Sequence, residues 1–162
     1  MEEIFRKYPI GIQSFEKLRN NNYVYVDKTS LIYKLANTNS TYFLSRPRRF
    51  GKSLLVSTLE AYFLGKKELF HGLAMETLEK EWTVYPVLHL DFSVSKYMTA
   101  DMLSAAINRQ LLQWEKLYGR EEGETTFSLR FEGIIHRAYQ QTGKQAVVLI
   151  DEYDSPMLDS NN

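Results

Sequence analysis

The chain has 162 residues, of which 44% are hydrophobic and 25% charged, a composition that fits one ordinary globular domain and excludes wholesale disorder. Its 20 Lys and Arg residues balance its 20 Asp and Glu residues, which argues against a protein that grips nucleic acid by bulk charge. Cys is absent, which excludes disulfide scaffolds, thiolate metal sites and cysteine nucleophiles. The charged N-terminus does not have the form of a signal peptide, and no window has the ~20 apolar residues of a membrane helix, so we expect a soluble, cytoplasmic protein.

The first part of the chain predicts short helices and strands. Apolar residues at helical spacing predict a helix over 12–19, stopped by the Asn run at 20–22. Aromatic and β-branched residues predict a strand over 23–26. Asp27 or Thr29 is the expected cap of the helix that follows.

The next elements surround the tripeptide Gly51-Lys52-Ser53. Residues 41–45 predict a strand before it, and a helix is expected to run from it to about Leu64, with Gly65 as its stop. Residues 66–84 predict a helical excursion, because their Leu residues lack one clean period.

The rest of the chain predicts two strands and two amphipathic helices. Residues 86–92 are typical of a buried strand with Pro at its first position. Residues 146–150 form an apolar run that is typical of a strand covered on both faces. Apolar stripes between them predict one helix from about 103 to 118 and another from about 127 to 138. Strands that alternate with helices indicate an α/β fold with a mostly parallel sheet flanked by helices.

Residues 45–53 carry a phosphate-loop motif between a predicted strand and a predicted helix. The general pattern is G-x-x-x-x-G-K-[ST]: backbone N–H groups cradle the phosphates, the Lys reaches the β- and γ-phosphates, and the hydroxyl binds Mg²⁺. The helix N-terminus adds the positive end of its dipole. Gly51, Lys52 and Ser53 match this pattern, whereas Arg46 stands at the first Gly position. The motif predicts nucleotide binding, and its alternative is a helix start with an incidental Gly-Lys-Ser.

A second motif stands about a hundred residues later, where the apolar run 147–150 ends in Asp151 and Glu152. This is the Walker B arrangement, in which the Asp at the carboxyl end of the strand helps to hold Mg²⁺. The carboxylate that follows can act as general base on the attacking water. The alternative is a core strand followed by a solvated acidic turn. Two motifs in this order, at the strand ends where open α/β sheets bind ligands, favour ATP or GTP binding.

With these residues, the chain resembles the predicted AAA-ATPase-like family of bacterial P-loop proteins, whose members often carry a PD-(D/E)XK nuclease-like domain further along. The resemblance covers nearly the whole chain and rests on residues 8–15, 25–29, 46–53 and 151–154. In that family Arg replaces the first Gly as a rule, so Arg46 departs only from the general pattern. The implied organisation is a lead-in over residues 1–40 and a P-loop core through Walker B over residues 41–162.

The resemblance also implies roles for single residues. Lys52 would contact the β- and γ-phosphates and Ser53 the Mg²⁺, while Asp151 would order that Mg²⁺ through water and Glu152 would polarise the hydrolytic water. The candidate nucleotide-binding set is the loop together with the start of the helix: Arg46, Arg48, Arg49, Phe50, Gly51, Lys52, Ser53 and Leu54.

Three roles stay open for the loop residues Arg46, Arg48 and Arg49. They could contact the triphosphate, since guanidinium groups pair well with phosphate, or brace the loop through an ion pair with a carboxylate. A small nucleic-acid patch is the least favoured role. No guanine-reading Asn-Lys-x-Asp segment is present, so ATP with Mg²⁺ is favoured over GTP by default and by the resemblance.

The resemblance further implies that a later part of the parent protein completes the sheet. In AAA-like proteins, the strand between the two motif strands comes later in sequence, as does any arginine finger from the same chain. We therefore expect this chain, which ends at Asn162, to be an N-terminal portion that lacks the central strand. A missing central strand leaves sheet edges unpaired. We therefore expect ATP hydrolysis by the intact parent protein and not by this portion alone.

Other candidate residues carry weaker signals. Asp91 ends a predicted strand and could either face the site or cap the next turn. Three His residues lack the spacing of metal ligands: His71, His89 and His136. Three Glu residues are expected in a solvated loop and not as a catalytic pair: Glu121, Glu122 and Glu124.

The leading hypothesis is an ATP-binding module whose nucleotide cycle controls an attached effector, such as a nuclease-like domain in the parent protein. The alternative is a nucleotide-inactive scaffold that binds a partner. Nucleic-acid binding through the Arg-rich loop is weaker still, because the net charge is zero. An oligomer is compatible with the sequence, and a membrane partner is not expected.

Overall fold

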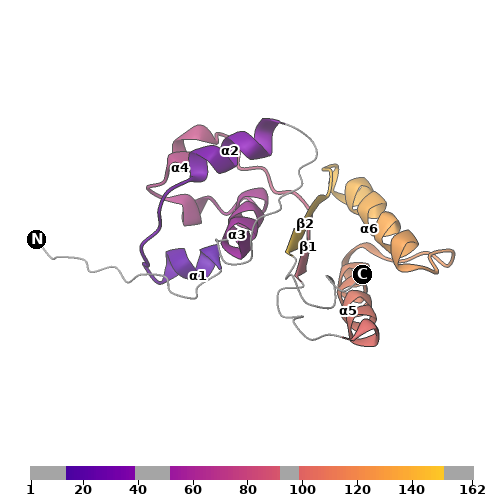
Figure 1. The fold of residues 1–162 in the computed structure, drawn as a ribbon. Helices are drawn as coiled ribbons and strands as arrows, with labels where there is room; N and C mark the ends of the chain where they lie inside the picture. Colours follow the sequence, from indigo (N-terminus) through magenta and orange to yellow (C-terminus); the bar gives the residue numbers. More distant parts are fainter. Residues whose placement is uncertain (1–13, 39–51, 92–98, 152–162) are drawn as a thin grey trace, which may run out of the picture. The chain divides into compact units, whose positions relative to one another are not determined.

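The computed structural model describes residues 14–38, 52–91 and 99–151. It is a mixed α/β structure, mostly helical, with a small parallel sheet (Figure 1). The chain divides into two compact units, the N-terminal unit Met1–Val84 and the C-terminal unit Tyr85–Asn162, and each is described by itself. The elements follow one another in this order: α1 Phe15–Asn20, α2 Thr29–Thr38, α3 Lys52–Phe63, the 3₁₀ helix η1 Lys67–Phe70, α4 Ala74–Leu78, β1 Val87–Asp91, α5 Ala100–Tyr118, α6 Phe127–Thr142 and β2 Val147–Asp151.

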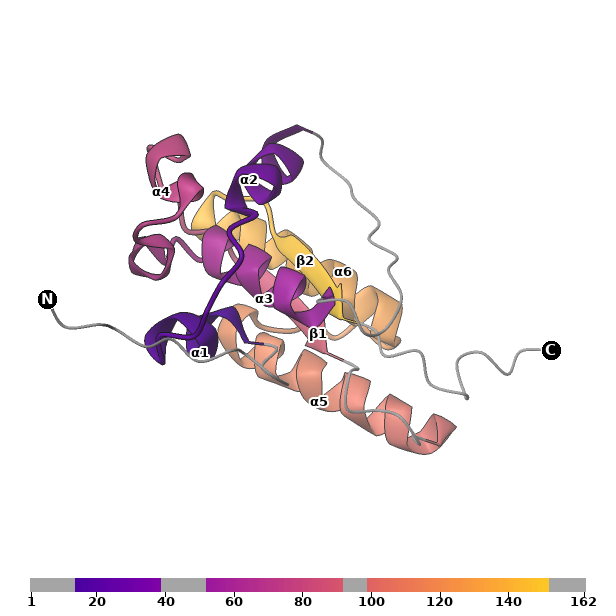
Figure 2. The ribbon, with the colours of Figure 1, turned by 60° about the vertical axis from the view of Figure 1, so that its left-hand side comes forward.

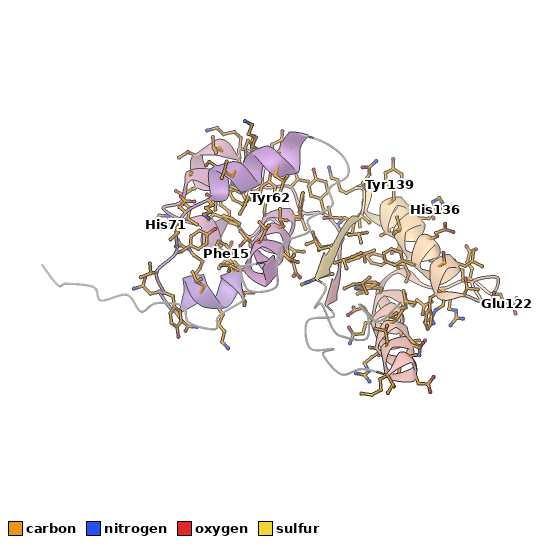
Figure 3. The ribbon with its side chains drawn as sticks, in the orientation of Figure 1. Phe15, Tyr62, His71, Glu122, His136 and Tyr139 are labelled. Atoms are coloured by element: carbon orange, nitrogen blue, oxygen red, sulfur yellow. The ribbon has the colours of Figure 1, made fainter. Side chains whose placement is uncertain are left out.

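Short helices around an aromatic core form the N-terminal unit. Helix α1 packs against α3, and α2 packs against α4. Phe15 of α1 is fully buried, and its ring centroid lies 4.9 Å from that of Phe70 and 5.3 Å from that of Tyr25. Tyr62 of α3 meets Trp82 edge-on at 5.9 Å, and Figure 3 shows Phe15 and Tyr62 both turned into this unit. Aromatic pairs of this kind contribute about 0.5–1.5 kcal/mol beyond the area they bury.

Helix α1 ends where the Asn run predicted a stop. Asn22 has a φ of 56°, a left-handed conformation that Asn tolerates better than most residues. The N–H of Asn22 donates to the carbonyl of Arg19 and the N–H of Tyr23 donates to that of Leu18. This pair of bonds is the Schellman motif, which satisfies carbonyl groups that a helix end would leave without partners.

Helix α3 ends in the same way at Gly65, which confirms the predicted stop. Gly65 has a φ of +69°, its N–H donates to Tyr62, and the N–H of Lys66 donates to Ala61. A Cβ atom at this Gly would lie 2.8 Å from the carbonyl oxygen of Trp82. Gly65 is therefore required both by its backbone conformation and by the close approach of a neighbouring chain segment.

The strand predicted at residues 23–26 is wrong. Within the described residues, only Tyr23 forms an isolated bridge there, and the segment runs without regular structure to α2. Its aromatic side chain at Tyr25 packs on Phe15, while Val26 is 72% exposed. The residues have the composition of a strand, but this segment uses them to cover the core of a helical unit. The predicted strand 41–45 lies outside the described residues.

The described residues of the C-terminal unit form two parallel strands and two long helices. Strand β1 pairs with β2 from Val87 opposite Val147 to Asp91 opposite Asp151, and Figure 2 shows the two strands side by side. Leu88 of β1 packs with Leu111 and Trp114 of α5 and with Ile134 of α6. The helices predicted from apolar stripes are confirmed in place and type. Side-chain caps begin both helices: Thr99 accepts from the N–H of Met102, and Thr126 accepts from that of Leu129.

Strand β2 differs from its prediction in its surroundings. A continuous apolar run predicted burial on both faces, yet Val148 and Ile150 are 37% and 48% exposed. The physical reason is that β2 has one partner strand, β1, within the described residues. An edge strand keeps part of its side-chain surface in contact with solvent.

A buried ion pair joins α5 to α6. Both oxygens of Glu115 accept from Arg130, at 2.6 Å and 3.1 Å, and the third guanidinium nitrogen donates to Asn108 at 2.7 Å. The side chains of Arg130 and Glu115 are only 5% and 6% exposed. Such a bidentate pair holds a fixed distance and angle between two helices.

A second pair corrects the prediction of a wholly solvated acidic loop. Glu124 accepts from two nitrogens of Arg137 at 2.6 Å and 2.8 Å, and its side chain is 12% exposed. A Cβ atom on Gly133 would lie 2.0 Å from this carboxylate. Because Gly133 has no side chain, the Glu124 carboxylate can occupy this space. Glu121 and Glu122 are exposed, as predicted.

Gly65→Ala should destabilise the protein more than Gly143→Ala does. Both Gly residues have left-handed φ angles, +69° and +71°, but Gly143 has no atom within 4 Å of an added Cβ. The backbone strain alone costs about 1 kcal/mol, and the contact with the Trp82 carbonyl should bring the cost at Gly65 to about 3 kcal/mol. Urea unfolding followed by circular dichroism measures the difference, and equal costs would contradict the steric argument.

Glu115→Gln should cost about 3 kcal/mol of unfolding free energy, because it leaves the Arg130 charge buried without its partner. The matched control is Glu16→Gln, which breaks the ion pair from Glu16 to Lys66 at 3.1 Å, where the side chains are 55% and 35% exposed. That exposed pair should be worth less than about 1 kcal/mol. Trp114 lies in the core between α5 and α6, so its fluorescence in urea measures the unfolding free energy of each variant. Similar losses of stability in the two variants would contradict the prediction.

Candidate functional site

Helix α3 begins where the phosphate-loop motif requires it. Lys52 and Ser53 are its first two residues and Leu54 is the third, so all three belong to the helix turn whose N–H groups lack intrahelical acceptors. The helix has 12 residues, long enough for its dipole to favour an anion at this end. For Lys52 and Ser53 the described structure is that of the backbone. The other candidate loop residues lie outside the described residues: Arg46, Arg48, Arg49, Phe50 and Gly51.

The first turn of α3 is held by hydroxyl groups one turn further along. The carbonyl of Leu54 accepts from Thr58 Oγ1 at 2.7 Å and from Ser57 Oγ at 3.0 Å. Ser57 Oγ also accepts from the backbone N–H of Phe15 at 2.9 Å. These bonds cannot be predicted from local patterns, because Ser57 and Thr58 belong to no motif and the Phe15 contact joins residues 42 positions apart.

The acidic half of the motif lies at the end of strand β2. Asp151 is the last residue of β2, and its partner in the register is Asp91, the last residue of β1. Because the strands are parallel, the structure brings these two predicted positions to the same carboxyl edge of the sheet, the edge where α/β sheets bind ligands. The backbone is described at both positions, and Glu152 lies beyond the described range. Lys52 belongs to the N-terminal unit and Asp151 to the C-terminal unit.

Of the two candidate caps of α2, Asp27 accepts from its first residue, Thr29, and both residues also cap a distant helix. Asp27 Oδ1 accepts from the N–H of Thr29 at 2.9 Å and from its hydroxyl at 2.6 Å. Asp27 Oδ2 accepts from the N–H of Ala74 at 2.8 Å, and Thr29 Oγ1 accepts from that of Met75 at 3.0 Å. Ala74 and Met75 open α4, so one short segment satisfies the first donors of two helices.

These bonds account for the acidity of Asp27. Burial acts to raise the pKa of Asp27, but the hydrogen bonds from Thr29 and Ala74 and the nearby charge of Arg19 outweigh it and hold the pKa below its usual range. The carboxylate form of Asp27 is therefore part of the structure of the N-terminal unit.

A second polar group links three segments of this unit. The hydroxyl of Tyr62 donates to a carboxylate oxygen of Glu79 and accepts from Asn37 Nδ2 at 3.1 Å. Burial, followed by the hydrogen bond to Glu79, raises the pKa of Tyr62. Burial also acts to raise the pKa of Glu79, but hydrogen bonds from Tyr62 and from backbone N–H groups lower it overall.

The three His residues show no metal site within the described ranges 14–38, 52–91 and 99–151. No group of three His, Asp or Glu side chains there could hold a metal ion. His71 lies on the surface, where its ring nitrogen is 3.0 Å from Glu76, and His136 is exposed on α6, as Figure 3 shows. His89 lies within β1.

The helices described for this chain also lack the length and apolar character needed to cross a membrane.

The comparisons with known proteins show the family of the chain. The family described as "Predicted AAA-ATPase" matches residues 9–162, and the chain belongs to this AAA-ATPase-like family. The chain is also 40% identical over 157 residues to an "Uncharacterized protein in vnfD 5'region" from Azotobacter chroococcum mcd 1. That match covers 96% of this chain and 30% of the relative, so the chain spans about a third or less of the relative's length. No solved structure matches the chain.

The ionised carboxylate of Asp27 should contribute to the unfolding free energy at neutral pH, and this contribution should be lost in acid. Because the folded pKa lies below the ordinary value of 3.8, the contribution is complete above the unfolded pKa and disappears as pH falls through the folded pKa. Asp27→Asn should cost about 1 kcal/mol at pH 7, as loss of a helix cap does, and should cost much less at pH 2. Urea unfolding between pH 7 and pH 2 tests this. A cost that stays constant over this range would contradict it.

Proposed function

We propose that this chain binds Mg-ATP through the turn that begins α3, as the nucleotide-binding portion of an AAA-like ATPase. The observation that carries the proposal is the start of α3 at Lys52, directly after Gly51. Gly51 offers no side-chain acceptor to the first N–H groups of the helix, and a phosphate loop uses such donors to bind phosphate. Membership of the AAA-ATPase-like family, which covers residues 9–162, supports a nucleotide as the anion.

Each candidate residue has a role in this proposal. Lys52 contacts the β- and γ-phosphates, and Ser53 and Asp151 hold the Mg²⁺, Asp151 through water. Glu152 acts on the hydrolytic water in the intact ATPase. The backbone N–H groups of Phe50, Gly51 and Leu54 belong to the loop and helix start that surround the phosphates. The role of Asp151 is supported by its position: it is the last residue of β2, at the carboxyl end of a parallel strand.

The loop residues Arg46, Arg48 and Arg49 keep two roles in the proposal. Their guanidinium groups contact the triphosphate or brace the loop against a carboxylate. Arg46 occupies the position of the first Gly of the general motif, where bracing replaces the conformational freedom of Gly. The overall charge balance of 20 to 20 does not favour nucleic acid as the anion.

In the whole protein, we propose that the nucleotide cycle controls an effector in the remaining part of the chain. The relative from Azotobacter chroococcum mcd 1 extends well beyond the matched region, since the match covers 30% of its length. That length leaves room for further domains, and a nucleotide-driven change of conformation is the usual way in which such ATPases act on them.

Mg-ATP should raise the melting temperature of this chain, and Lys52→Ala should abolish the rise. A ligand that binds only the folded state stabilises it by about 2.7 kcal/mol at a hundredfold excess over its Kd. Lys144→Ala removes the same charge from an exposed loop and should leave the rise unchanged. Thermal unfolding of the three proteins, with and without Mg-ATP, provides the test. Absence of a rise in the folded parent chain would contradict the proposal for this chain.

A further inference from the structure

Ser57 connects the start of the nucleotide-binding helix to helix α1. Its Oγ atom donates to the carbonyl of Leu54 at 3.0 Å, and the same oxygen accepts from the backbone N–H of Phe15 at 2.9 Å. Leu54 is the third residue of α3 and Phe15 the first residue of α1. One hydroxyl group thus joins the first turns of both helices.

The Phe15 end of this connection is fixed in the core. Phe15 is fully buried and packs against Phe70 and Tyr25. Its N–H is one of the donors that a helix start leaves without an intrahelical acceptor. The side chain of Ser14 accepts from the N–H of Lys17. The N–H of Phe15 instead donates to Ser57, which belongs to another helix. A displacement of α1 therefore breaks a bond on α3, and a displacement of α3 exposes a donor on α1.

The Leu54 end lies close to the proposed phosphate contacts. A helix rises by about 1.5 Å per residue, so Ser57 is about one turn from Ser53. Any movement of the first turn of α3 changes the positions of the N–H groups and of the Lys52 backbone that the proposed function assigns to phosphate. Small errors in the position of such groups weaken binding, because the donors must already point at the anion.

We infer that Ser57 is a positioning residue for nucleotide binding, which holds the first turn of α3 against α1 and couples the docking of α1 to occupancy of the site. This inference rests on the proposed function and adds a residue outside the motif. Coupling between two sites is reciprocal. Nucleotide at α3 should protect the Phe15 amide from exchange, and loss of the Ser57 bond should weaken nucleotide binding.

The test compares Ser57→Ala, Ser57→Thr and Thr58→Val with the parent chain. Ser57→Ala removes the connection, whereas Ser57→Thr keeps the hydroxyl group. Thr58→Val is the matched control: it removes a bond of 2.7 Å to the same Leu54 carbonyl and a hydrogen bond with the Tyr25 side chain, but it keeps the acceptor of the Phe15 N–H. Calorimetric titration with Mg-ATP gives the Kd, and amide hydrogen exchange by NMR, with and without Mg-ATP, follows Phe15. Circular dichroism shows that each variant is folded.

Ser57→Ala should weaken Mg-ATP binding about fivefold, the size of one well-placed hydrogen bond. Mg-ATP should slow exchange of the Phe15 amide in the parent chain and in Ser57→Thr, and should not slow it in Ser57→Ala. Thr58→Val should keep both the affinity and the protection. Equal weakening by Thr58→Val would overturn the inference, because the effect would then belong to the Leu54 carbonyl alone.

Failure of the inference is distinct from failure of the proposed function. An unchanged Kd in Ser57→Ala, with the parent chain still binding Mg-ATP, overturns the inference and leaves the proposed function in place. A Phe15 amide that does not respond to Mg-ATP in a parent chain that binds it overturns the coupling. A folded parent chain that shows no binding overturns both.

Discussion

The helices of this protein depend on one constraint, which is that the first N–H groups of a helix must find acceptors outside it. Side-chain acceptors meet this need at five of the described helices. Ser14, Thr99 and Thr126 accept from their own helices. Asp27 accepts from the first residue of α2, and Asp27 and Thr29 also accept from α4, at a distance of 47 and 46 residues in sequence. Helix α3 is preceded by Gly51, which has no side chain to offer. The proposed function assigns the acceptor at the start of α3 to a phosphate.

Buried polar groups also find hydrogen-bond partners between the helices of the C-terminal unit. Arg130 lies almost fully buried in the interface of α5 with α6, yet its guanidinium nitrogens bond to Glu115 and Asn108. Apolar packing alone specifies one arrangement less strictly, because hydrophobic cores of about the right volume lose uniqueness before they lose stability. A buried bidentate pair is costly to break and has one geometry, so it favours a single arrangement of α5 on α6 even where its net contribution to stability is small.

The sequence predicts those parts of the fold that local patterns determine. Helices α5 and α6 carry apolar stripes and Thr caps within a few residues of each other, and the stops at Asn22 and Gly65 follow from left-handed backbone that these two residue types tolerate best. The start of α3 at Lys52 also follows from a local motif. In each case the information lies within one or two helical turns.

Predictions failed where the outcome depends on residues far apart in sequence. Residues 23–26 have the composition of a strand, but a strand requires a neighbour, and Tyr25 packs on an α-helical core in its place. The burial of Glu124 depends on Gly133, nine positions later, where any Cβ atom would occupy the space of the carboxylate. The second role of Asp27 at α4 and the Ser57 contact with Phe15 are of the same kind. No periodicity or motif contains these pairings.

These long-range contacts determine how a ligand at α3 would act on the rest of the N-terminal unit. A phosphate at the start of α3 adds acceptors only in the folded state, so its binding free energy adds to the stability of whatever the first turn of α3 requires to stay in place. That turn is bonded through Ser57 to Phe15, and Phe15 packs against Phe70 of η1. Stabilisation at the helix start therefore extends, through one hydroxyl group and one buried ring, to elements that the motif does not include. In this arrangement a ligand at the helix start and a distant element depend on the same few atoms, which is the physical basis of a coupling free energy between two sites.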